Sequence, residues 1–448
     1  MTLDAAEPLA IDPLLDDPGT RIIVCCGSGG VGKTTTAAAL GVRAAERGRK
    51  VVVLTIDPAR RLAQSMGIDS LDNTPRRVKD VEGDGELHAM MLDMKRTFDE
   101  IVEAHADPER ASAILGNPFY QSLSAGFAGT QEYMAMEKLG QLRAKDEWDL
   151  IIVDTPPSRS ALDFLDAPKR LGSFLDGKLI RVLLAPAKVG GRAGMKFLNV
   201  GMSMMTGALG KLLGGQLLKD VQTFVAAMDS MFGGFRTRAD ATYKLLQAPG
   251  TAFLVVAAPE RDALREAAYF VERLAAEDMP LAGLVLNRVH GSGADRLSAE
   301  RALAAAENLE EPRIVDQEGG KAGLRNSPDT YDSSDSTASE APAPDAGSPA
   351  ATDSERTAAT DEPKSVTPHV ERSVDQLTAG LLRLHAERMR LLSREQRTRD
   401  RFTALHPEVA VAEVAALPGD VHDLAGLRDI GNRLAANRPE LPDPAVDA

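Results

Sequence analysis

Short apolar runs recur along the chain and are separated by segments with helical spacing of apolar residues. The runs are continuous, rich in β-branched residues and bounded by Gly, Pro or Asp, as in strands buried on both faces of a parallel sheet. They span residues 21–26, 50–56, 150–153, 252–257, 281–287 and 409–417. Segments such as Thr34–Arg47 and Asp262–Ala276 have the helical pattern. This alternation predicts an α/β fold with a doubly wound, mostly parallel sheet.

Two stretches interrupt this alternation. Residues 167–247 have helical spacing without a strand pattern, and their middle part, 195–218, is rich in Met, Leu and Gly. They predict an inserted helical subdomain, whose methionines fit either an ordinary core or an adaptable apolar surface. Residues 326–363 lack Val, Ile, Leu, Met and Phe. Such a segment cannot bury enough apolar area to offset its ordering entropy, so we predict disorder there.

These patterns divide the chain into five parts. We expect a flexible N-terminus, a core in two pieces, an inserted helical subdomain, a disordered acidic linker, and C-terminal helices that bring the last strand of the core. The N-terminus spans 1–19 and the core spans 20–166 and 248–312. The helical subdomain spans 167–247, the linker 313–372, and the C-terminal part 373–440.

Composition narrows the classes of partner and the cellular location. The chain has 448 residues and a net charge of −14, and residues 326–363 hold nine acidic residues against one basic residue. An acidic total argues against nucleic acid as a partner. The acidic N-terminus is unlike a signal peptide, and no uninterrupted apolar run is long enough to span a bilayer. We therefore expect a cytoplasmic protein, and the abundance of Arg and Ala suggests a bacterial genome of high GC content.

The strongest chemical signal follows the first predicted strand. Gly27, Ser28, Gly29, Gly30, Val31, Gly32, Lys33 and Thr34 match G-x-x-x-x-G-K-[ST] between a strand and a helix. In such a loop, successive backbone N–H groups and the helix N-terminus bind phosphate. Lys33 can reach the β- and γ-phosphates, and the Thr34 hydroxyl can ligate Mg²⁺. The motif predicts binding of ATP with magnesium.

Two aspartates end predicted strands that would lie beside this loop. Asp154 follows the apolar run 150–153, where its carboxylate can hold the metal. Asp57 ends the run 50–56, where its carboxylate could orient or deprotonate the attacking water. Taken singly, each could instead cap the helix that follows it. With Lys33 they form the predicted catalytic set, and Thr34, Asp57 and Asp154 form the predicted metal site.

Several segments together resemble the ArsA/guided-entry ATPase family of the deviant-Walker-A P-loop (SIMIBI) class, to which MinD and ParA are related. They are Gly-Gly-Val-Gly-Lys-Thr-Thr ending at Thr35, Thr-Ile-Asp-Pro-Ala around Asp57, and Asp-Thr-Pro-Pro from Asp154, followed by Ala-Leu-Asp-Phe-Leu. The resemblance implies that Gly27–Thr35 bind the phosphates, that Asp57 is the catalytic carboxylate of switch I, and that Asp154–Arg159 form switch II. It implies a P-loop ATPase core.

The same resemblance assigns the nucleotide contacts beyond the phosphates. It implies that Glu260 contacts the nucleotide, that Asn287 reads the adenine and that the turn containing Pro418 covers the purine. Residues 167–247 fall where this family keeps its client-binding helices. A hydrophobic client or a membrane-protein partner is implied on that basis.

Three positions depart from the family pattern. Ser28 stands where the family's signature lysine reaches across a dimer, so a homodimer would lack that cation. Residues 289–293 replace the Cys-x-x-Cys zinc pair of eukaryotic members, so no zinc is expected. The separated thiols of arsenical-pump members are absent, and the adjacent Cys25 and Cys26 are expected to be core thiols.

The resulting hypothesis is an ATP-hydrolysing switch that works as a homo- or heterodimer and controls an apolar helical surface. Ser28 favours a heterodimer with a homologous ATPase that carries the lysine. One alternative is a weakly hydrolysing nucleotide-binding subunit of a heteromeric ATPase. Another is a MinD- or ParA-like positioning ATPase, although residues 438–448 do not form the basic amphipathic tail that this alternative requires.

Overall fold

Eight strands form one sheet in the computed structural model of the chain, counted over the described residues. The strands are β1 (Ile22–Gly27), β2 (Lys50–Thr55), β3 (Arg76–Arg77), β4 (Glu86–Met91), β5 (Leu150–Asp154), β6 (Thr251–Ala257), β7 (Leu281–Val289) and β8 (Val411–Ala415). Their order is β3-β4-β2-β5-β1-β6-β7-β8. The short β3 pairs antiparallel with β4, and the other pairs are parallel. The predicted fold class, a mostly parallel α/β sheet, is confirmed.

The structure describes residues 7–57, 61–123, 131–156, 237–310 and 374–436, together with positions 220, 224 and 234. The chain divides into two units, Met1–Asp295 with Arg388–Ala448, and Arg296–Glu387. The first unit contains the sheet. The second contains α13 (Ala299–Glu310) and the first part of α14 (Val374–Leu405).

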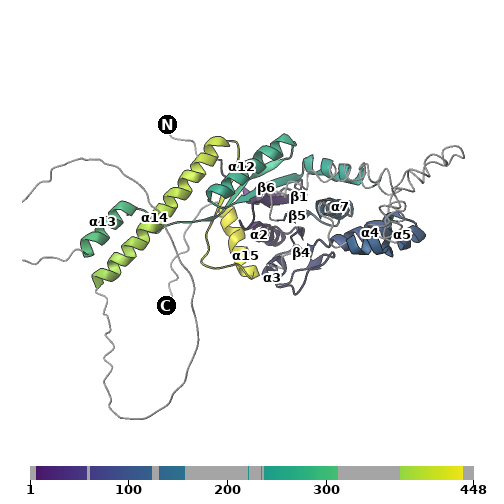
Figure 1. The fold of residues 1–448 in the computed structure, drawn as a ribbon, viewed down its shortest axis with the longest axis horizontal. Coiled ribbons are helices and arrows are strands. Elements are labelled where there is room, and N and C mark those ends of the chain that lie inside the picture. Colours follow the sequence, from purple (N-terminus) through teal and green to yellow (C-terminus); the bar gives the residue numbers. More distant parts are fainter. Residues whose placement is uncertain are drawn as a thin grey trace, which may run out of the picture. The chain divides into compact units, whose positions relative to one another are not determined.

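Helices cover both faces of the sheet. On one face lie α1 (Ile11–Asp16), α2 (Lys33–Glu46), α3 (Arg61–Ser65) and α15 (Leu424–Ala436). On the other lie α4 (Met94–His105), α5 (Pro108–Leu115), α7 (Gln131–Ala144), α12 (Arg261–Ala276) and the part of α14 that carries Phe402; α6 spans Pro118–Leu123. Figure 1 shows α2 and α15 close together, and Arg428 of α15 donates to Glu46 of α2 at 2.7 Å.

Side chains of the central strands point alternately to the two faces of the sheet and pack into two separate hydrophobic cores. In β1, Ile22, Val24 and Cys26 belong to the core beneath α7 and α12, whereas Ile23 and Cys25 belong to the core beneath α2 and α15. Both thiols are fully buried, and burial raises the pKa of Cys26 to about 12 and that of Cys25 well above its usual range. The prediction of core thiols is confirmed.

The N-terminal segment differs from the prediction. We expected residues 1–19 to be flexible, but α1 packs on the core, with Leu9, Ile11 and Leu15 buried. The backbone N–H of Leu9 also donates to the carbonyl oxygen of Val411, the first residue of β8, at 3.0 Å. Three apolar side chains are enough to fix this segment, because they join the core that α2 and α15 share.

Two further outcomes concern the predicted parts. Strand β4 was not predicted, because its sequence Glu-Leu-His-Ala-Met-Met has no β-branched residue and mixes polar with apolar side chains. Most of the predicted helical subdomain, 167–247, and all of the predicted linker, 313–372, lie outside the described residues. Within the predicted subdomain, 237–247 is helical.

Among the described helices, none is both long and apolar enough to cross a membrane.

Candidate functional site

The loop between β1 and α2 has the conformation that its glycines permit. Gly27 has φ +146°, and a Cβ there would lie 2.1 Å from the carbonyl oxygen of Val256. Gly32 has φ +96°, and a Cβ there would lie 2.2 Å from Nδ2 of Asn287. At Gly30, φ is +77° and nothing lies within 4 Å of a Cβ, so the loop opens toward free space on that side. Side chains are thus excluded at the two positions where the loop packs most closely.

Lys33, the first residue of α2, lies folded back under the loop. Its Nζ donates to the carbonyl oxygen of Ser28 at 2.8 Å, and the residue is only 5% exposed. Burial lowers the pKa of Lys33, while the nearby Asp154 and Asp57 carboxylates act in the opposite direction. The Lys33 side chain therefore connects the end of the loop with its beginning. Its ammonium group lies where it could contact the oxygens of a phosphate bound by the loop.

Asp154 is the centre of a buried polar cluster. Its Oδ2 accepts hydrogen bonds from the hydroxyls of Thr34 at 2.8 Å and Thr55 at 2.9 Å. Its Oδ1 is buried and accepts no hydrogen bond in the part of the chain that the structure describes. Burial raises the pKa of Asp154 to about 6, against the lowering effect of both hydroxyls and of Lys33. A buried carboxylate oxygen without a donor, beside a threonine hydroxyl, fits a hard cation such as Mg²⁺ or its water.

Asp57 lies on the neighbouring strand at the same sheet edge. β2 pairs with β5 so that Thr55 is opposite Asp154, and Asp57 follows Thr55 by two residues. Its backbone N–H donates to the Thr55 hydroxyl at 3.2 Å, and its side chain is half-buried. The structure thus brings Asp57, Asp154 and the phosphate loop to one edge, as the carboxyl ends of parallel strands require.

The residues predicted to contact the ribose and base are less buried, or bonded differently, than those of the phosphate site. Asn287, 8% exposed, donates from Nδ2 to the carbonyl oxygen of Val31 at 2.8 Å, so in this structure its amide supports the phosphate loop. Glu260 precedes the first residue of α12 and is exposed, and Pro418 is exposed beyond the end of β8. Because β6, β7 and β8 run parallel to β1 in the same sheet, their carboxyl ends lie on the same edge as the loop. The contacts of these residues with the nucleotide stay predictions.

The remaining residues of the phosphate loop differ in exposure. Gly29 is exposed, Val31 is buried at 4% exposure, and Thr35 is half-buried in the first turn of α2. Over the described ranges, no group of three or more His, Cys, Asp or Glu side chains could hold a metal ion. Binding of magnesium by Thr34, Asp57 and Asp154 stays a prediction.

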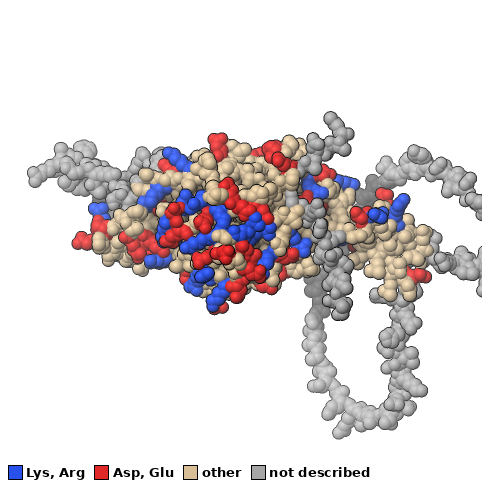
Figure 2. Space-filling model, turned by 180° about the vertical axis from the view of Figure 1, so that it is seen from behind, with Lys and Arg blue, Asp and Glu red and all other residues tan. Residues whose placement is uncertain are grey.

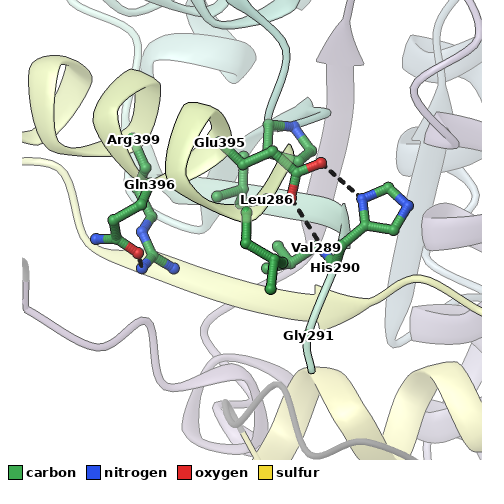
Figure 3. Close-up of a pocket in the computed structure, with 9 residues that line it drawn as sticks. Leu286, Val289, His290, Gly291, Glu395, Gln396 and Arg399 are labelled. Carbon is green, nitrogen blue, oxygen red and sulfur yellow. Dashed lines mark hydrogen bonds and ion pairs between the residues drawn. The ribbon is translucent and has the colours of Figure 1, made fainter. Parts of the chain in front are cut away.

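A cavity of about 220 Å³ lies beyond the ends of β6 and β7, on the face covered by α12 and α14. Its apolar walls include Leu286, Val289 and Leu392. Glu395 of α14 accepts a hydrogen bond there from the backbone N–H of His290 at 3.2 Å and contacts its ring Nδ1 at 2.6 Å (Figure 3). None of the loop residues 27–35 lines it, so this cavity is separate from the phosphate site.

Sequence reasoning missed Thr55 as a member of the site. Its hydroxyl bonds both Asp154 and the backbone N–H of Asp57, and so connects the two aspartates. The available signal was its place two residues before Asp57 at the end of a buried strand, where a polar side chain faces the loop.

The fold and this loop geometry define a P-loop ATPase. A sequence model of the ArsA ATPase family, described as anion-transporting ATPase, matches residues 20–311, and the chain belongs to that family. It is an ATP-hydrolysing enzyme.

Three relatives share the name ATPase GET3. That of Malassezia globosa is 31% identical over 174 residues, which are 39% of this chain and 50% of the relative. That of Podospora anserina is 26% identical over 306 residues, 67% of this chain and 83% of the relative. That of Botryotinia fuckeliana is 26% identical over 338 residues, 72% of this chain and 92% of the relative. The chain thus spans about half the length of the first relative and most of the other two. These organisms are fungi, so they lend no support to a bacterial origin.

Proposed function

We propose that this ATPase is a switch in which the nucleotide state controls an apolar helical surface for a client or partner. The proposal that the switch hydrolyses ATP rests on a single observation, the Thr34–Asp154–Thr55 cluster beside the Lys33 loop. The family resemblance of residues 167–247 supports the proposal that the switch controls a client or partner surface. We retain a bacterial, cytoplasmic protein as the expected source and location.

The site residues divide the tasks of ATP hydrolysis between them in this proposal. The loop N–H groups and Lys33 bind the β- and γ-phosphates. Thr34 and Asp154 would hold Mg²⁺, and Asp57, which follows Thr55 at the same sheet edge, would bind its water shell. When bound, the ion neutralises charge on the transferring phosphoryl group. Asp57 orients the attacking water and accepts its proton. Glu260, Asn287 and Pro418 contact the ribose and base.

Dimer formation is part of the proposal because Ser28 leaves one role unfilled. A hydroxyl cannot supply the positive charge that the signature lysine of the family would bring to the partner's site. We therefore favour a heterodimer with a homologous ATPase that retains this lysine. The same residue favours a second candidate function, a subunit that binds nucleotide but hydrolyses it slowly by itself.

Surface charge supports a protein partner over nucleic acid. In Figure 2, Lys and Arg side chains near the middle of the face shown are bordered by Asp and Glu. Arg43 of α2 is neutralised locally, since it pairs with Asp12 at 2.5 Å. A phosphate backbone needs a concentrated basic face.

Steady-state ATP hydrolysis by the purified full-length chain, alone and mixed with a lysine-bearing homologue, tests the proposal. We expect slow turnover alone and acceleration in the mixture, both dependent on Mg²⁺. Brisk turnover alone, unchanged by the homologue, would exclude the heterodimer and leave the Asp57 and Asp154 assignments standing.

A further inference from the structure

The backbone of Ile56, the residue before Asp57, is held from two sides. Its N–H donates to the carbonyl oxygen of Asp154 at 2.9 Å. Its carbonyl oxygen accepts a hydrogen bond from Nε2 of Gln131 at 2.8 Å. Since a peptide unit is planar, fixing the carbonyl of Ile56 also fixes the N–H of Asp57 and the direction in which its Cα leaves the strand. Gln131 therefore contacts the peptide unit that joins Ile56 to Asp57.

Gln131 is the first residue of α7, a helix that the core holds firmly. Among its next residues, Tyr133, Met134 and Met136 are at most 5% exposed and pack in the same core as Ile56. A helix buried in this way moves only together with its neighbours, because interiors are close-packed. Gln131 thus offers Ile56 a fixed donor.

The middle of α7 is joined to another element, the helix 237–247. Glu137, almost fully buried, accepts hydrogen bonds from the Tyr133 hydroxyl at 2.9 Å and from Nε of Arg238 at 2.6 Å. One turn further, a Cβ on Gly140 would lie 2.7 Å from Oγ1 of Thr242, so the two helices are in close contact. The buried Glu137 carboxylate holds Arg238 in a specific geometry, since separating the two leaves the buried negative charge uncompensated.

We propose that Gln131 is a positioning residue for Asp57, and that it makes α7 the connection between the hydrolytic edge and the helix 237–247. This rests on the proposed role of Asp57. A change in the Asp57 loop when ATP becomes ADP alters the Ile56–Gln131 hydrogen bond, and α7 passes this change to Arg238 and Thr242. The helix 237–247 is the described end of the segment proposed to bind a client.

Two variants of the full-length chain test the positioning role. Gln131→Met keeps the length of the side chain and removes the donor, and Gln131→Glu keeps the shape and removes the N–H. For both we expect kcat to fall about 10- to 100-fold while the dissociation constant for ATP changes less than about 2-fold, because misplacing a reacting group costs rate rather than binding. Gln141→Met, further along the same helix, is the matched control and should keep both values. An unchanged kcat in both Gln131 variants would overturn the positioning role.

A double-mutant cycle with Asp57→Asn separates this inference from the proposed function. If Gln131 acts through Asp57, Gln131→Met has no further effect on the residual rate of Asp57→Asn. A full additional loss in that background would show that Gln131 acts elsewhere. Normal turnover by Asp57→Asn alone would contradict the proposed function itself and the inference with it.

Hydrogen exchange tests the connection. In the wild type we expect amides of 237–247 to exchange at different rates with ADP and with a non-hydrolysable ATP analogue, each with Mg²⁺. Gln131→Met should abolish this difference, and Gln141→Met should retain it. A difference of wild-type size in Gln131→Met, or none in the wild type, would overturn the connection.

Discussion

The two halves of the nucleotide-binding edge are built differently. At the ends of β1, β2 and β5, the hydroxyls of Thr34 and Thr55 donate to the buried Asp154, and the buried Lys33 donates to the carbonyl oxygen of Ser28. At the ends of β6 and β8, Glu260 and Pro418 are exposed. Between them, Asn287 contacts the phosphate loop. The phosphate half is held in place by its own hydrogen bonds, so substitutions there should cost far more than substitutions in the base half.

The largest loss of ATP affinity is expected from Lys33→Ala. Removing a buried ammonium that bridges the loop should weaken ATP binding about 10²–10³-fold, as for truncation of one partner of a buried charge pair. Isothermal titration with ATP and Mg²⁺ measures it. Arg43→Ala, which removes a cation nearer the other end of the same helix, serves as the control and should bind ATP normally. Retained affinity in Lys33→Ala would place the phosphates elsewhere.

Ser28→Lys should raise the rate of the isolated chain. One well-placed donor at a transition state is worth on the order of 10²–10³ in rate, and a dimer that supplies the new lysine in trans should recover part of this. Rates are compared at several protein concentrations, since the gain requires dimer formation. Ser28→Met is the control for side-chain length without charge. Equal rates for the lysine and methionine variants would remove the need for a cation from the partner.

Thr55→Val sharpens the comparison within the phosphate half. It preserves shape but removes a hydrogen bond to Asp154, and loss of such a supporting contact lowers metal affinity about 10-fold or more. We expect the Mg²⁺ concentration for half-maximal hydrolysis to rise by that amount. Thr36→Val, at a buried position on α2, controls for the substitution itself. An unchanged Mg²⁺ requirement would show that Thr55 does not support the metal ligand.

The raised pKa of Asp154, about 6 against an ordinary value of 3.8, predicts a pH dependence. In the ligand-free protein this group favours folding fully below pH 3.8, and its contribution is lost as the pH rises to about 6. Magnesium requires the ionised form, so Mg²⁺ affinity should fall about tenfold for each unit below about pH 6. Binding measured from about pH 5 to about pH 8, corrected for the nucleotide's own titration, checks this. A flat profile would exclude Asp154 as a ligand.

The smallest effect is expected from Glu260→Ala. Its exposed carboxylate should contribute less than about 1 kcal/mol, which is a change in KM below about fivefold. Asn287→Ala should cost more, because it leaves the carbonyl oxygen of Val31 without this donor. Both are read from ATP saturation curves. The reverse order would show that the base half is organised only when nucleotide binds.

The sequence allowed the phosphate half to be predicted in some detail. A spaced motif names its own residues, and parallel strands bring Asp57 and Asp154 to one edge wherever the helices lie. Thr55 and Gln131 were not predicted, since their roles depend on which way a single side chain faces across non-neighbouring segments. Strand β4 and helix α1 were missed for a related reason: local composition was ambiguous there, and packing on the sheet decides their structure.

The central claim is that Asp57 serves hydrolysis and not binding, and Asp57→Asn tests it most directly. ATP affinity and single-turnover hydrolysis are measured on the same preparation, with the lysine-bearing partner present. We predict an affinity within about 2-fold of the wild type and a rate lowered about 10²–10⁴-fold, as expected for loss of a general base. A near-normal rate, or a matching loss of affinity, would contradict the account.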